Sequence, residues 1–171
     1  MSRSLRILAA ICLAIGGIFG TVGAMVGLQS LRSAAWGLDG TAVVVATALL
    51  ALHFFRKNRD AVAAGFLVYA IGEAVMLGGT AGTLEASVPA FAAGIALWSA
   101  GLFLISVPRE LPLLTRTAGL ISAFLFAMAA ARIFWGTPLT PIARPFPYFV
   151  YPFLVLTFIG WIVDLLRAEK P

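Results

Sequence analysis

The sequence predicts an all-α membrane protein, a polytopic bundle of about six antiparallel transmembrane helices that make up one domain. Hydrophobic residues form 61% of the 171 residues and charged residues only 11%, whereas a soluble domain is about half apolar and a quarter charged. The charged residues gather between long apolar segments. Each segment is close to the ~20 residues that a helix needs to cross ~30 Å of hydrocarbon.

Charges and turn residues mark where the apolar segments begin and end. The first segment follows two arginines near the N-terminus, and the charged turn 56–60 separates the second from the third. Further breaks fall at 81–86, at 108–114 and at the proline-rich stretch 137–148. We therefore expect helices over residues 7–28, 36–55, 61–80, 87–107, 115–135 and 149–166. Helices are expected because lipid offers no hydrogen-bond partners, and the segments lack the alternating pattern of barrel strands.

The distribution of lysine and arginine predicts the orientation, because cytoplasmic loops of membrane proteins are enriched in both. On one side of the predicted bundle lie Arg3, Arg6, Arg56, Lys57, Arg59, Arg109, Arg116, Arg167 and Lys170. The other side carries only Arg32 and Arg144, while Arg132 falls within the fifth segment. This bias predicts that both termini are cytoplasmic, in what we expect to be a bacterial inner membrane.

Small residues recur along the first segment at four-residue spacing. Gly16, Gly20 and Ala24 share one helix face, and Gly23 and Gly27 repeat the spacing on a neighbouring face. Such residues let a second helix approach closely, which favours helix association in lipid. The partner can be the second helix, another helix of the chain, or a second copy in a homo-oligomer.

Two ionisable residues inside the spans are candidates for a polar site, because each costs about 2.5–3.5 kcal/mol to insert. Helical rise puts Glu73 and Arg132 about 18 and 24 Å from the cytoplasmic end, so the long arginine side chain can reach the carboxylate. Tyr69 precedes Glu73 by one turn and shares its face. Such a pair either binds a solute or proton or only fixes the packing. Alternatively, Arg132 extends to the outer interface beside Trp135.

Asp39 and His53 lie near the two ends of the second segment. Asp39 is expected to cap the start of that helix, and His53 is expected at the cytoplasmic interface. Their side chains cannot meet, because 14 residues of helix separate them by about 21 Å.

Several functional classes are disfavoured. A single cysteine, Cys12, permits no intramolecular disulfide and no cysteine cluster for a metal, and no cofactor site is predicted. The net charge of +5 arises from clusters between apolar segments rather than from a patch with stacking aromatics, so we expect no nucleic acid partner. The sequence contains no nucleophile elbow, no His-Glu-x-x-His pattern and no phosphate-binding loop.

Three functional hypotheses follow. The first is a non-catalytic membrane protein that acts through helix packing with protein partners or lipids. The second is a transporter or channel for a small solute or protons, with a polar site around Glu73, Arg132 and Tyr69. The third is a membrane enzyme with an interfacial site that uses His53.

The orientation can be tested with reporter fusions. Reporters placed after Lys170 and within residues 56–60 should both report a cytoplasmic location, because most basic residues lie on that side. A reporter that reads the opposite side at either position would contradict the arrangement of six spans.

Overall fold

The structure is a computed structural model that describes residues 1–80 and 82–167, apart from the side chains of residues 147 and 148. The described residues form the helices α1 (Arg3–Met25), α2 (Gln29–Phe55), α3 (Asp60–Gly79), α4 (Val88–Ser106), α5 (Leu113–Phe134) and α6 (Phe146–Arg167). Each of these helices is long and apolar enough to cross a membrane. The prediction of an all-α transmembrane bundle is confirmed.

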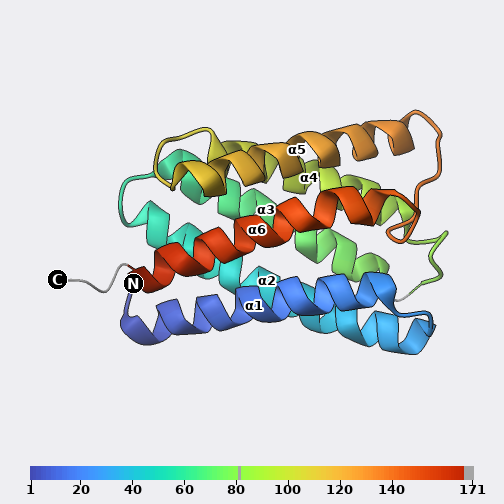
Figure 1. The fold of residues 1–171 in the computed structure, drawn as a ribbon, viewed down its shortest axis with the longest axis horizontal. Helices are drawn as coiled ribbons and strands as arrows, with labels where there is room; N and C mark the ends of the chain where they lie inside the picture. Colours follow the sequence, from blue (N-terminus) through green and yellow to red (C-terminus); the bar gives the residue numbers. More distant parts are fainter. Residues whose placement is uncertain (81, 168–171) are drawn as a thin grey trace.

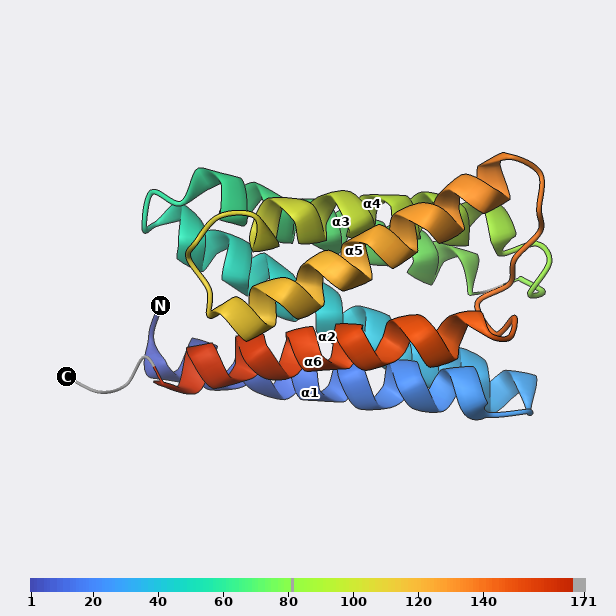
Figure 2. The same ribbon diagram turned by 45° about the horizontal axis from the view of Figure 1, so that its top comes forward.

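The helices are arranged as a closed ring. Each helix packs against its neighbours in the chain, and α6 returns to pack against α1 (Figures 1 and 2). The N-terminus, the α2–α3 and α4–α5 turns and the last turn of α6 lie at one end, which we call the terminal end (Figure 1). The other three connections lie at the opposite end, which we call the pocket end. All the basic residues expected on the cytoplasmic side belong to the terminal end, except Lys170, which lies outside the described residues.

Aromatic side chains fill the centre of the ring. We call Phe66, Tyr69, Trp98, Phe158 and Trp161 the aromatic layer, and all five are buried. The rings of Tyr69 and Trp98 stack with centroids 4.8 Å apart, and Trp161 meets the edges of Phe66 and Tyr69 at 4.8 and 5.9 Å. Because α2, α3, α4 and α6 all contact this layer or supply it, the layer connects the helices of the ring across its centre.

The α1–α2 pair has a regular register. Three glycines of α1, spaced by four and three residues, each lie against a larger α2 side chain, and the α2 residues have the same spacing in the opposite direction. The pairs are Gly16 with Val43, Gly20 with Asp39, and Gly23 with Trp36. Gly27 follows the end of α1, and its carbonyl oxygen accepts a hydrogen bond from Arg32. The partner of the small residues is therefore α2 of the same chain. Ala24, which the sequence grouped with Gly16 and Gly20, lies outside this contact.

Helix α2 begins earlier than the sequence indicated, at Gln29 rather than near Trp36. Its N-terminal turn is held by Arg32, whose Nη2 donates hydrogen bonds to the carbonyl oxygens of Val26 (2.7 Å) and Gly27 (3.4 Å). These carbonyls follow the end of α1 and would otherwise lack a helical partner. The prediction that Asp39 caps α2 is wrong, because Asp39 lies well inside the helix.

Substitution of a contact glycine tests the α1–α2 register. A Cβ atom at Gly16 would collide with Val43, so Gly16→Leu should lower the free energy of unfolding by about 1–3 kcal/mol. Gly37→Leu is the matched control, because Gly37 is a glycine within α2 with no atom in the way, and it should leave stability unchanged or raise it. Thermal unfolding in detergent measures both. Equal effects of the two substitutions would contradict the register.

Candidate functional site

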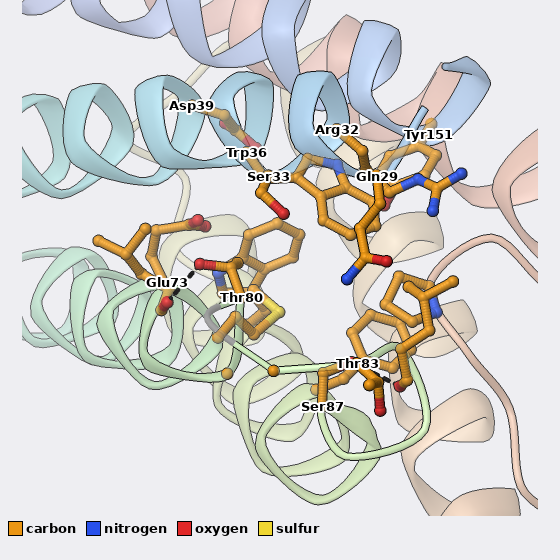
Figure 3. Close-up of a pocket in the computed structure, with 18 residues that line it drawn as sticks. Gln29, Arg32, Ser33, Trp36, Asp39, Glu73, Thr80, Thr83, Ser87 and Tyr151 are labelled. Atoms are coloured by element: carbon orange, nitrogen blue, oxygen red, sulfur yellow. Dashed lines mark hydrogen bonds between the residues drawn. The ribbon is translucent and has the colours of Figure 1, made fainter. Parts of the chain in front are cut away.

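Two carboxyl groups on adjacent helices line one pocket at the pocket end of the bundle (Figure 3). Asp39 extends from α2 and is partly buried, and Glu73 extends from α3 with only 4% of its surface exposed. The two carboxyl groups are close enough to influence each other electrostatically. Sequence reasoning identified Glu73 as a site residue but gave Asp39 the role of a helix cap, because it placed the start of α2 too late.

Each carboxyl group lies against a glycine of a neighbouring helix. A Cβ atom at Gly20 of α1 would lie 2.8 Å from Asp39 Oδ2, and one at Gly40 of α2 would lie 3.0 Å from Glu73 Oε1. Real Cβ atoms essentially never show the first distance, and the second is tighter than nine in ten real Cβ contacts. The helices are therefore close together at both acidic residues, and the space that the carboxylates occupy depends on these glycines.

Neither carboxylate has a cationic partner in the described part of the chain. Glu73 Oε2 is buried and accepts no hydrogen bond. The indole N–H of Trp98 interacts with this carboxyl group, but Trp98 Nε1 makes no hydrogen bond of normal geometry. Buried polar atoms almost always have hydrogen-bond partners. The described residues supply none for Glu73 Oε2, so we expect a bound group to provide it.

The predicted pair of Glu73 and Arg132 does not form. Arg132 lies in the last turn of α5 with an exposed side chain, and α4 separates α5 from α3 in the ring, so that the described parts of α3 and α5 make no contact. Its neighbour Trp135 is 84% exposed. Arg132 thus lies exposed near the pocket end of α5, and its extension to the outer interface stays a prediction.

Tyr69 lies with Glu73, as the one-turn spacing predicted. It is fully buried and stacks on Trp98, and its hydroxyl group has no hydrogen-bond partner. Electrostatic interactions connect this hydroxyl group to Glu73, Asp39 and Tyr151. Four acidic or phenolic groups from α2, α3 and α6 are thus close enough to interact electrostatically.

The pocket combines these groups with aromatic walls and a polar rim. It contains about 710 Å³ of empty space, counted with its open mouth. The aromatic walls are Trp36, Phe91, Trp98 and Tyr151. Around the mouth lie Gln29, Ser33, Thr80, Thr83 and Ser87 (Figure 3).

Arg32 lies at the mouth of the pocket, at the opposite end from the carboxyl groups (Figure 3). Its guanidinium group is bonded to the Val26 carbonyl and stands 5.9 Å from the centre of the Trp36 ring. The hydrogen bond holds the guanidinium group near the end of α1, away from both carboxyl groups.

A second, smaller cavity lies at the terminal end. It encloses about 360 Å³ and is lined by His53, Lys57, Arg6 and Asp164, with Phe66 and Trp161 at its inner end. His53 thus lies near the terminal end, as predicted, but it contributes to a cavity rather than only to the interface. The aromatic layer separates this cavity from the pocket that contains Asp39 and Glu73.

Comparisons with protein-family models, with curated proteins and with solved structures find no match to this chain. The site is therefore interpreted from its own chemistry.

Proposed function

We propose that the protein is a membrane transporter that binds the ammonium group of a small organic cation between Asp39 and Glu73. The observation that carries this proposal is the pair of carboxyl groups inside the bundle, which has no cationic partner among the described residues. A bound cation would offset the free energy of keeping these groups away from water.

The walls of the pocket support an organic cation over a metal ion. Trp36, Trp98 and Tyr151 line the same pocket as the carboxylates, and aromatic rings attract ammonium groups through cation–π interactions. Hard metal ions such as Ca²⁺ take six to eight oxygen ligands. The described residues contain no group of three or more metal-binding side chains, so this donor set suits an ammonium group better.

The two cavities support transport rather than binding alone. One is entered from the pocket end and the other lies at the terminal end. Trp98 lines the first and Trp161 the second, and Tyr69 contacts both of these rings. Transporters expose a central site alternately to the two sides of the membrane. In this protein, a shift of Tyr69 and Trp161 would connect Glu73 with the cavity at the terminal end.

The proposal reverses the ranking of hypotheses that the sequence favoured. Action through protein partners rested mainly on the small residues of α1, and Gly16, Gly20 and Gly23 are occupied by α2. That face is therefore not available to a partner. The second hypothesis gains support because Glu73 lines a pocket and Tyr69 is buried beside it, although Asp39 replaces Arg132 as the neighbour of Glu73.

Ligand titration tests the binding step. Methylammonium, tetramethylammonium and choline are added in turn to the purified protein, and the fluorescence of Trp36 and Trp98, which line the pocket, is followed. We expect a saturable change with at least one probe, and Glu73→Gln and Asp39→Asn should each weaken that binding at least about tenfold, or 1.4 kcal/mol. Glu85→Gln is the control, because Glu85 is an exposed acidic residue in the α3–α4 connection. A lack of response to all three probes, or an equal response to sodium, would contradict the ammonium site.

Uptake into proteoliposomes tests the transport step. The probe that binds best, carrying a radioactive label, should accumulate in vesicles that contain the wild-type protein and not in vesicles that contain Glu73→Gln. Binding without uptake would contradict transport while leaving the binding site intact.

A further inference from the structure

A third cavity, larger than the pocket and the cavity at the terminal end, opens on the outer surface of the bundle between α1 and α6. We call it the α1–α6 groove, and its walls include Gly17, Thr21 and Ala24 of α1 and Val155 and Ile159 of α6. It contains about 2180 Å³ of empty space, counted with its open side. Since α1 and α6 both span the membrane, this open side faces the hydrocarbon of the bilayer.

The groove is long enough to cross the hydrocarbon of one leaflet. Along α1 its walls run from Leu13 to Val26, a length of about 20 Å at 1.5 Å per residue. One leaflet contributes half of the ~30 Å hydrocarbon core, about 15 Å. An acyl chain that enters at the pocket end can therefore lie along the groove to the middle of the membrane.

Two arginines stand where the groove reaches the pocket end. Arg32 and Arg144 both line it, and none of the described residues along its walls is acidic. Only 8% of the Arg32 surface is exposed, and its Nε is buried without a hydrogen-bond partner. An apolar channel with a doubly positive end is complementary to an apolar chain with an anionic head.

We propose that the α1–α6 groove binds an anionic phospholipid of the surrounding bilayer. Its phosphate lies between Arg32 and Arg144, and one acyl chain lies against Gly17, Ala24 and Val155. Arginine binds phosphate well because its planar group presents several donors. The groove and the proposed ammonium site share Arg32 and Tyr151 as lining residues, but neither Asp39 nor Glu73 lines the groove.

Native mass spectrometry of the detergent-purified protein tests this site. The protein is incubated with phosphatidylglycerol or phosphatidylcholine at equal concentrations, and retained lipid is counted. Phosphatidylglycerol should bind at least about fivefold more tightly, as expected for about one additional favourable arginine contact. Arg144→Gln should abolish this preference. Arg132→Gln is the matched control, because Arg132 is exposed near the same end of the bundle but does not line the groove.

A second pair of variants tests the chain-binding part. Ala24→Phe fills the groove and should reduce retention of both lipids, whereas Ala74→Phe, at an exposed alanine of α3, should not. Inorganic phosphate should fail to displace phosphatidylglycerol; displacement at equal concentration would mean a site for the free anion. The proposal is overturned if the two lipids bind equally, if Arg132→Gln has the effect of Arg144→Gln, or if Ala24→Phe retains lipid as the wild type does.

Discussion

Two carboxyl groups inside a membrane bundle, without a cation from the described chain, are the constraint on which the rest of the structure depends. Each such group costs on the order of 2.5–3.5 kcal/mol in the middle of a span. The bundle places Asp39 and Glu73 on adjacent helices around one pocket, where each influences the other. An architectural role would call for an ion pair or a complete hydrogen-bond network. The cluster has neither, since Glu73 Oε2 and the Tyr69 hydroxyl group lack partners.

Helix packing explains how the chain holds these groups in place. The hydrogen bond of Arg32 to the end of α1 fixes the level at which α1 and α2 pair. Seven residues further along α2, two helical turns away, Asp39 then meets Gly20. On the other side, α3 and α4 pack through Gly72 and Gly94, where a Cβ atom on either glycine would lie 2.8 Å from the carbonyl oxygen of the other. Close packing on both sides fixes the width of the pocket.

The sequence predicted those features that depend on residue type and spacing within one segment. Long apolar segments were sufficient for the six helices, and the one-turn spacing of Tyr69 and Glu73 placed them together. Features that depend on neighbouring helices were missed. Helical rise gives the depth of Arg132 but not its position around the ring, and α4 lies between its helix and that of Glu73. The position of Asp39 inside α2 was missed because the polar residues before Trp36 resemble a loop. The hydrogen bond by which Arg32 holds the first turn of α2 cannot be recognised in the sequence. The sequence does not distinguish Trp98 and Tyr151, which line the pocket, from other aromatic residues in apolar segments.

The thermal stability of the ligand-free protein with Glu73→Met tests the central claim most directly. Methionine has a similar length and no charge. If the carboxyl group is kept for a ligand at the expense of stability, the substitution should raise the melting temperature by about 2–4 °C for each kcal/mol recovered. Glu85→Met, at an exposed position, should leave the melting temperature unchanged. A fall in the melting temperature of Glu73→Met would show that the carboxyl group stabilises the bundle, and would contradict the account given above.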